Sequence, residues 1–319
     1  MANKNQTSYV SVVMTSYNRG HYIGQAIDSI LAQECNFSFE IIIGDDCSTD
    51  NSRELLQSYK DKYPDIFVLN FHEANVGFGP NWASTLKLAR GKYVTFCDDD
   101  DYYCDNHRMQ SMVDFMDAHP EYGLTHTNYY NLFMETGEMI PNNAKDSTGT
   151  DAIWGLRTGG YNICFGACMI RNELIQKHVS LDDYIRLKFP IQDWPTCMLL
   201  APHTEFKYLN QLSYVYRKHK GSMSSPQEYE TIVRKYTQEK VMNRYVHEQL
   251  GIEYDEPGDD RYRYSILLRL AYDKNDYKNA HEFAKHCDKR NKKRWFASTW
   301  LTFQLFRIAK KLKNKLLNK

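Results

Sequence analysis

Short apolar runs alternate with amphipathic segments along the first 120 residues of the chain. Four runs rich in β-branched and aromatic residues have the length of buried strands, and they cover Tyr9–Met14, Phe39–Ile43, Ile66–Phe71 and Tyr93–Cys97. Between them, apolar residues recur at helical spacing and predict three helices. The first covers Ile23 to Leu31 and the third Asn81 to Ala89, whereas the second has Ser52 or Asp50 as its N-cap and ends before Pro64. Strands that alternate with helices at this interval indicate βαβ crossovers. The pattern predicts an α/β fold with a mainly parallel sheet.

The pattern changes after Tyr122. Short strands are predicted at residues 122–127, 164–170 and 206–216, and a polar stretch from residue 135 to 160 interrupts them. We therefore expect a mixed second half of the sheet. Beyond Pro226 the chain reads as helical, with helices over residues 229–250, 262–272 and 277–287. These boundaries predict a domain at 1–225 and a helical extension at 226–288.

The last segment, residues 289–319, is predicted to be a basic amphipathic tail. It contains eleven Lys or Arg and no acid, whereas residues 1–288 hold 29 bases and 40 acids. A helix over 295–317 would carry its apolar and polar positions on separate faces, namely Leu301, Leu305, Ile308, Leu312 and Leu316 against Lys311, Asn314 and Lys315. Such a helix can lie in the interface of an anionic membrane. The alternative, that it packs on the body or on a partner, stays open.

Composition narrows the class of protein. Hydrophobic residues at 42% and charged residues at 25% are ordinary for a globular chain, and we expect no nucleic-acid partner. The eight cysteines show neither a CxxC pair nor regular spacing, which favours reduced thiols in the cytoplasm. No apolar run reaches the ~18 residues of a membrane span, and the N-terminus lacks an apolar signal sequence. We expect a cytoplasmic protein, peripheral at the inner face of the membrane if the tail binds there.

Four consecutive aspartates, Asp98 to Asp101, follow the fourth strand directly. Four like charges repel one another, so a bound cation is their simplest explanation, with a solvated acidic loop as the alternative. Ligands of open α/β sheets bind beyond the carboxyl ends of the strands. Residues 15–18 and 45–46 follow the first two strands, so we expect all three segments at one edge. A carboxylate there could accept from a ring N–H of a nucleotide, and Mn²⁺ or Mg²⁺ could hold its diphosphate.

Four motifs, in this order and at these intervals, resemble those of family-2 glycosyltransferases with the GT-A fold. They are VSVVMTSYNR, FEIIIGDDCSTDNS, ANVGFGPNWASTLKLARGKYVTFCDDDDYY and IQDW, and together they span most of residues 8 to 225. The resemblance implies a Rossmann-like, mainly parallel sheet with a mixed second half. It also implies transfer of a sugar from a nucleotide donor, usually UDP-linked, with inversion at the anomeric carbon.

The resemblance also implies roles for individual residues. The nucleotide-binding candidates are Thr15, Tyr17, Asn18, Asp45, Asp46, Asn75, Asp98 and Asp99. The family's Asp-x-Asp motif falls on Asp98 and Asp100, with Asp100 as direct metal ligand, although a register through Asp99 and Asp101 stays open. His219 is the second candidate ligand of Mn²⁺ or Mg²⁺.

Asp193 matches the general base of the family, and Gln192 departs from the Glu-Asp pair of many relatives. Each of these polar residues has a structural alternative as a turn, cap or loop residue. The acceptor would be a saccharide or, with a membrane-bound tail, a lipid-linked saccharide.

Two other functions compete with this interpretation. A metal-dependent nucleotidyltransferase also needs aspartates, but it usually has a Gly-rich phosphate loop after the first strand, where this chain has SYNRG. A non-catalytic carbohydrate- or metal-binding module would need neither Asp193 nor a nucleotide pocket.

Overall fold

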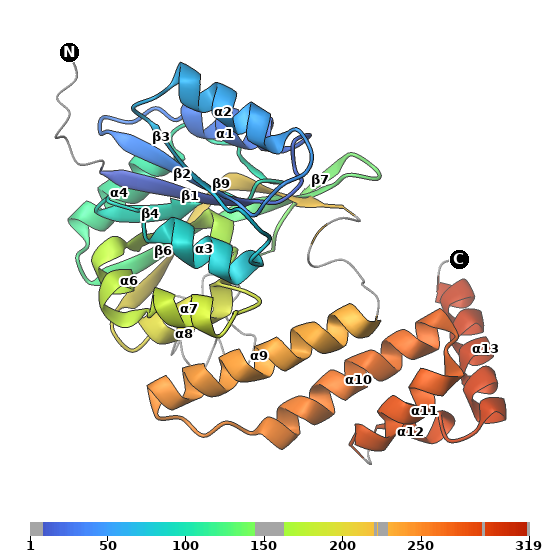
Figure 1. Cartoon of the computed structure of the whole chain (residues 1–319). Coiled ribbons are helices and arrows are strands. Elements are labelled where there is room, and N and C mark those ends of the chain that lie inside the picture. The colour runs from blue at the N-terminus through green and yellow to red at the C-terminus, as the bar shows by residue number, and fades with distance from the viewer. Residues whose placement is uncertain (1–8, 144–162, 220–221, 223–228, 289–290, 318–319) are drawn as a thin grey trace. The chain divides into compact units, whose positions relative to one another are not determined.

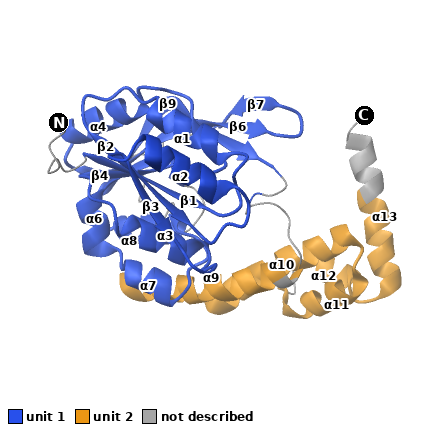
Figure 2. Cartoon of the chain, turned by 45° about the horizontal axis from the view of Figure 1, so that its top comes forward, with its two compact units in different colours: residues 1–226 blue, residues 227–319 orange. Residues whose placement is uncertain are grey.

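The computed structural model describes residues 9–143, 163–219, 222, 229–288 and 291–317, except the side chains of residues 230, 292 and 311–317. The chain divides into two compact units, Met1–Pro226 and Gln227–Lys319, which Figure 2 shows in blue and orange. Each unit is described by itself below. In the described part of the chain, no helix is both long and apolar enough to span a bilayer.

In its described residues, the first unit is built on a sheet of nine strands, in the order β3-β2-β1-β4-β8-β6-β9-β5 with β7 paired to β6 (Figure 1). The strands are β1 Val10–Ser16, β2 Phe39–Asp45, β3 Phe67–Phe71, β4 Tyr93–Phe96, β5 Tyr102–Tyr103, β6 Tyr122–Phe133, β7 Glu138–Pro141, β8 Cys168–Arg171 and β9 Glu205–Lys218. Strands β3, β2, β1 and β4 are parallel, whereas β8 runs antiparallel to both β4 and β6. The predicted parallel first half and mixed second half are confirmed.

Helices cover both faces of this sheet. They are α1 Ile23–Leu31, α2 Ser52–Lys62, α3 Phe78–Leu86, α4 Arg108–Ala118, α6 Asn172–His178, α7 Leu181–Arg186 and α8 Asp193–Leu200, with a 3₁₀ turn η1 at Phe165–Ala167. Apolar residues of α1, α2 and α4 share one buried cluster with Val10, Val12 and Met14 of β1. On the other face, Trp82 of α3 contacts the rings of Phe96 and Tyr184. Because both faces are covered, the central strands are mostly apolar.

Helix α3 differs from the predicted helix, which begins at Asn81. The helix begins at Phe78, so Pro80 lies in its first turn. A proline is tolerated there because the first backbone N–H groups of a helix have no partner inside it. Helix α2 also differs: its N-cap residue is Asn51, and Asp50 instead accepts from the backbone N–H of Ser52 (3.0 Å).

The second unit is entirely helical in its described residues. It contains α9 Tyr229–Leu250, α10 Glu256–Lys274, α11 Tyr277–His286, α12 Lys292–Phe296 and α13 Trp300–Leu317. The single helix predicted for 295–317 is therefore two helices separated by a break at residues 297–299. Ala297 in that break and Phe303 after it are fully buried in one cluster with Leu268 and Ala271 of α10.

Candidate active site

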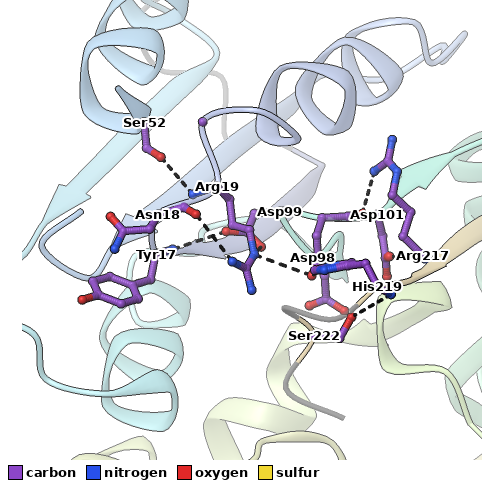
Figure 3. Close-up of polar contacts among 12 residues, drawn as sticks. Tyr17, Asn18, Arg19, Ser52, Asp98, Asp99, Asp101, Arg217, His219 and Ser222 are labelled. Atoms are coloured by element: carbon purple, nitrogen blue, oxygen red, sulfur yellow. Dashed lines mark hydrogen bonds and ion pairs between the residues drawn. The ribbon is translucent and has the colours of Figure 1, made fainter. Parts of the chain in front are cut away.

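Three loops meet at the carboxyl edge of the parallel strands, as the sequence predicted. Strand β1 ends opposite β2, with Ser16 paired to Asp45, and β4 lies on the other side of β1. The loops after these strands carry Tyr17 to Arg19, Asp46, and the four aspartates. Figure 3 shows the side chain of Arg19 directed toward Asp99, whereas the side chains of Tyr17 and Asn18 point away from it. The backbone N–H of Tyr17 donates to Oδ2 of Asp99 (3.3 Å). Residues that are far apart in the sequence are therefore adjacent at this edge of the sheet.

The four aspartates alternate in exposure. Asp98 and Asp100 are half-buried, whereas Asp99 is 9% exposed and Asp101 is fully buried. The two carboxylate oxygens of Asp101 accept from the Tyr214 hydroxyl (2.7 Å) and from the backbone N–H of Arg217 (2.7 Å). Asp101 therefore anchors the acidic loop to β9, and the half-buried pair Asp98 and Asp100 remains accessible to a ligand.

Asp100 and His219 form the contact best suited to a divalent cation. The Nε2 atom of His219 lies 2.9 Å from Oδ2 of Asp100, and the imidazole is 9% exposed. Adjacent ligands of an octahedral ion with bonds of about 2.1 Å lie about 3 Å apart, so this pair fits Mn²⁺ or Mg²⁺. Within the described residues, no three His, Cys, Asp or Glu side chains group closely enough to hold a metal ion. Two protein ligands suit an ion whose remaining positions are filled by phosphate and water.

Two arginines balance part of this negative charge. The Nε atom of Arg19 lies 4.0 Å from Oδ1 of Asp99 and 3.7 Å from Oδ2 of Asp100. Arg217 donates from Nη1 to the backbone carbonyl of Asp100 (2.6 Å) and from Nη2 to the side chain of Gln25. Its guanidinium also lies over the ring of Tyr102, 4.6 Å from the centroid. Arg217 therefore fixes the backbone of the acidic loop, whereas Arg19 approaches the carboxylates themselves.

Burial and mutual repulsion disfavour the charged forms of the carboxylates in the acidic run. Burial raises the pKa of Asp98 above its usual range, and the charges of Asp100 and Asp193 raise it further. Burial and Asp100 also raise the pKa of Asp99, while Arg19 opposes that rise. A divalent cation would relieve this repulsion, so the chemistry of the donor set fits one.

Asp45 and Asp46 have local partners at the end of β2. The carboxylate of Asp46 accepts from the backbone N–H groups of Val76 (2.7 Å) and Gly77 (3.0 Å), and Asn75 donates to its backbone carbonyl (3.3 Å). Asp45 is fully buried. Its Oδ1 atom accepts from Arg53, while its Oδ2 atom has no hydrogen-bond partner. Asp46 and Asn75 thus order the turn before α3, at the border of the predicted nucleotide pocket.

The first loop is held in a similar way. Asn18 has a positive φ of 54°, and its side-chain oxygen accepts from the backbone N–H of Thr49 (2.8 Å). Its own backbone N–H donates to the hydroxyl of Ser48 (2.9 Å). Thr15 is half-buried in β1, whereas the ring of Tyr17 is 46% exposed. Of these three residues, Tyr17 offers the largest surface to a ligand.

Asp193 is the first residue of α8. Its carboxylate accepts from the backbone N–H of Trp194 (2.8 Å), and its charge raises the pKa of Asp98. The structure therefore brings Asp193 near the acidic run, although 92 residues separate Asp193 from Asp101 in the sequence. Sequence reasoning missed Arg19, Tyr214 and Arg217. The position of Arg19, directly after the first strand and opposite an acidic loop, was the available signal.

Comparisons with known proteins identify relatives. The model of "Glycosyl transferase family 2" matches residues 11–178, which is more than half of the chain. An uncharacterized protein of Mycobacterium tuberculosis is 30% identical over 216 residues, covering 66% of this chain and 59% of the relative. The chain thus spans less than two thirds of that protein. A putative teichuronic acid biosynthesis glycosyltransferase of Bacillus subtilis is 37% identical over 107 residues, covering 34% of this chain and 41% of the relative.

Solved structures share the fold. The structure of S. aureus TarS in complex with UDP-GlcNAc has a TM-score of 0.58 at 20% identity, and the match covers 88% of this chain and 82% of TarS. A mannosyltransferase from Pyrobaculum calidifontis, in complex with GDP-Man and Mn²⁺, gives 0.53 at 15% identity and covers 99% and 90%. The fold is the GT-A fold with a helical C-terminal part, and the nucleotidyltransferase and binding-module alternatives are not retained. The chain belongs to glycosyl transferase family 2.

Proposed function

We propose that the chain transfers a sugar from a UDP-linked donor to a saccharide or lipid-linked saccharide acceptor, with inversion at the anomeric carbon. The observation that carries the proposal is the 2.9 Å contact between Asp100 and His219, beside the half-buried Asp98 and near Asp193. Solved relatives bind UDP-GlcNAc or GDP-Man, and one of them also binds Mn²⁺. These complexes support a nucleotide-sugar donor for the family.

Each residue has a distinct role in this proposal. Asp193 accepts the proton of the acceptor hydroxyl as that oxygen attacks the anomeric carbon on the face opposite the diphosphate. A positioned base of this kind contributes about 10²–10⁴-fold to the rate. Asp100 and His219 hold Mn²⁺ or Mg²⁺, which, when bound, stabilises negative charge on the leaving diphosphate. The burial of Asp101 and its bond to β9 support the register through Asp98 and Asp100.

The nucleotide lies on the first two loops. Tyr17 presents its exposed ring to the base. Asp45 and Asp46, which are both buried, border the uracil edge, and Asp46 orders the turn at Val76 and Gly77 there. Thr15, Asn18, Asn75, Asp98 and Asp99 complete the pocket. Asn18, Asp46 and Asn75 also join neighbouring loops, so they shape the pocket even where they do not contact the donor.

Titration with nucleotides tests the donor. The purified chain is mixed with UDP- and GDP-sugars in the presence of Mn²⁺, and the melting temperature and the slow hydrolysis of each sugar are measured. A donor at 100 times its Kd stabilises the protein by about 2.7 kcal/mol, which is readily seen in a melt. If no nucleotide sugar and no nucleoside diphosphate raises the melting temperature, the proposed function is wrong.

Two substitutions separate binding from chemistry. We expect Asp193→Asn to abolish turnover while UDP still binds with wild-type affinity, because the side chain acts only on the acceptor. Asp100→Asn should weaken Mn²⁺ binding and remove the dependence of UDP affinity on Mn²⁺. Turnover that survives Asp193→Asn would exclude Asp193 as the base.

We also propose that the second unit attaches to the surface of an anionic membrane. The side chains of Trp295, Trp300, Leu301, Leu305 and Ile308 are 55–64% exposed, and we call them the outer face. The opposite side of α13 is already packed, since Phe303 is fully buried in the core of this unit. The outer face is therefore apolar surface that its own unit does not cover.

Charge and residue type favour a bilayer as the partner. Residues 289–319 contain eleven bases and no acid, and anionic lipid attracts such segments by about 1 kcal/mol for each base near the surface. Tryptophan, present twice on the outer face, is typical of membrane interfaces. The predicted continuation of the stripe to Leu312 and Leu316, with Lys311, Asn314 and Lys315 beside it, lies outside the described residues. A lipid-linked saccharide at the cytoplasmic side would be the corresponding acceptor.

Point substitutions test this better than truncation, which would remove the buried Phe303. The triple variant Leu301→Gln, Leu305→Gln, Ile308→Gln leaves the charge unchanged and should bind phosphatidylglycerol-containing vesicles at least tenfold more weakly. Val233→Gln, which alters a similarly exposed residue of α9, should bind as wild type. If the triple variant binds vesicles as tightly as the wild type, the membrane proposal is refuted. It is also refuted if the wild type binds no vesicles and the triple substitution converts a dimer into a monomer.

A further inference from the structure

The side chain of Arg19 occupies the space where a cation bound to the acidic run would act. Its Nε atom lies 3.7 Å from Oδ2 of Asp100, the same oxygen that His219 approaches to 2.9 Å. It also lies 4.0 Å from Oδ1 of Asp99. In Figure 3 the side chain of Arg19 extends from the first loop toward Asp99. A protein cation and the proposed metal ion therefore share one carboxylate oxygen.

The backbone beneath Arg19 is fixed, so only the side chain can respond to a ligand. The N–H of Arg19 donates to the hydroxyl of Ser52 (3.1 Å), and the N–H of Gly20 donates to Asp50 (3.0 Å). The side-chain oxygen of Asn18, the residue before Arg19, accepts from the backbone N–H of Thr49. The Arg19 side chain is 22% exposed and has several rotatable bonds, so it can turn toward solvent or toward a bound anion.

We propose that Arg19 is a stand-in cation, which neutralises Asp99 and Asp100 before the metal ion binds and then moves to the diphosphate of the donor. The proposal rests on the metal-dependent function proposed above. A divalent ion on Asp100 repels the nearby guanidinium, and a guanidinium pairs well with phosphate oxygens. The diphosphate can therefore pair with Arg19 once the metal ion has bound to Asp100.

The consequence is cooperative binding. Metal alone must displace Arg19 from its carboxylates, and UDP alone meets an acidic run without a divalent ion. When both bind, the diphosphate of UDP pairs with Arg19, and the metal ion neutralises the acidic run. By thermodynamic linkage, Mn²⁺ raises the affinity for UDP by the same factor by which UDP raises the affinity for Mn²⁺.

Substituting Arg19 should change the two affinities in opposite directions. We expect Arg19→Gln to bind Mn²⁺ alone about tenfold more tightly, because the competing charge is gone. The same variant should bind UDP in saturating Mn²⁺ about tenfold more weakly, because the phosphate loses a charged donor. Both affinities are measured by isothermal titration calorimetry on the full chain, and Mn²⁺ binding also by the electron paramagnetic resonance of the free ion. Neither readout depends on turnover.

Three further variants complete the test. Arg19→Met keeps the aliphatic stem and serves as a second neutral variant, with the same expected changes. Arg19→Lys keeps the charge, so its affinity for Mn²⁺ alone should stay within about twofold of wild type. Arg186→Gln removes an exposed arginine of α7 and should alter neither affinity.

The failures can be told apart. If the wild type binds no Mn²⁺ with or without UDP, the proposed metal-dependent function is refuted, and the role of Arg19 with it. If Mn²⁺ binds but Arg19→Gln and Arg19→Met have wild-type affinities, or if both affinities fall together, the stand-in role alone is refuted. Opposite changes in the two affinities support it.

Discussion

The hydroxyl of Tyr214 is a small group on which the acidic loop depends. It donates to Oδ2 of Asp101 (2.7 Å) and accepts from the backbone N–H of Asp98 (3.3 Å), and both Tyr214 and Asp101 are fully buried. Tyr214→Phe leaves the shape of the ring unchanged but leaves a buried carboxylate oxygen without this donor. A hydrogen bond to a charged group contributes about 1.5–3 kcal/mol, so we expect the free energy of unfolding to fall by about 2 kcal/mol.

Differential scanning calorimetry can measure this loss. For a unit of about 200 residues, a change of 1 kcal/mol shifts Tm by about 2–4 °C, so Tyr214→Phe should melt about 4–8 °C below wild type. The matched control is Tyr17→Phe, whose ring is 46% exposed and which should melt within about 1 °C of wild type. A Tyr214→Phe variant that melts within about 1 °C of wild type would show that Asp101 does not depend on this hydroxyl.

Two further predictions concern packing and pH. A Cβ atom at Gly79 would lie 1.9 Å from the carbonyl oxygen of Phe189, so Gly79→Ala should cost about 1–3 kcal/mol in urea unfolding. Gly24→Ala in α1, where the nearest atom lies at 3.7 Å, should instead stabilise by about 0.5–1 kcal/mol, and equal effects at both glycines would contradict the geometry. Partial burial raises the pKa of Asp117, but hydrogen bonds from Lys92 and nearby tyrosines outweigh it and lower the pKa below 3.8. The contribution of Asp117 is thus complete above pH 3.8 and lost below the folded pKa. Asp117→Asn should lose up to about 1 kcal/mol at pH 7 and approach wild type on acidification, and a constant difference from pH 7 to pH 2 would refute the shift.

The local spacing of apolar residues was sufficient to predict the architecture of the first unit. Apolar runs of strand length and helical spacing between them predicted β1 to β4, and the parallel topology then placed three loops at one edge. Helix α9 has the predicted bounds, Tyr229–Leu250. These features depend on the spacing of neighbouring residues, which the sequence displays directly.

The sequence alone could not predict how the four aspartates differ in burial and in their contacts. Sequence shows four equal carboxylates, whereas burial of Asp101 depends on Tyr214 and Arg217, more than 110 residues further along the chain. The same holds for Arg19, whose approach to Asp100 is set by how β1 and β4 pair. The outer face of α13 likewise becomes evident only once Phe303 is seen to be buried on the opposite side.

The contact between Asp100 and His219 spans 119 positions of the chain, from the end of β4 to the end of β9. During synthesis, a nascent chain released only as far as β8 has the aspartates but not the histidine. Under the proposed function, donor and metal ion can then bind only after β9 has joined β6 and β5 and the sheet is complete. Ligand binding would stabilise the finished unit by about 2.7 kcal/mol at 100 times Kd and would do nothing for its partly made precursors. The site would thereby discriminate between complete and incomplete molecules in the cell.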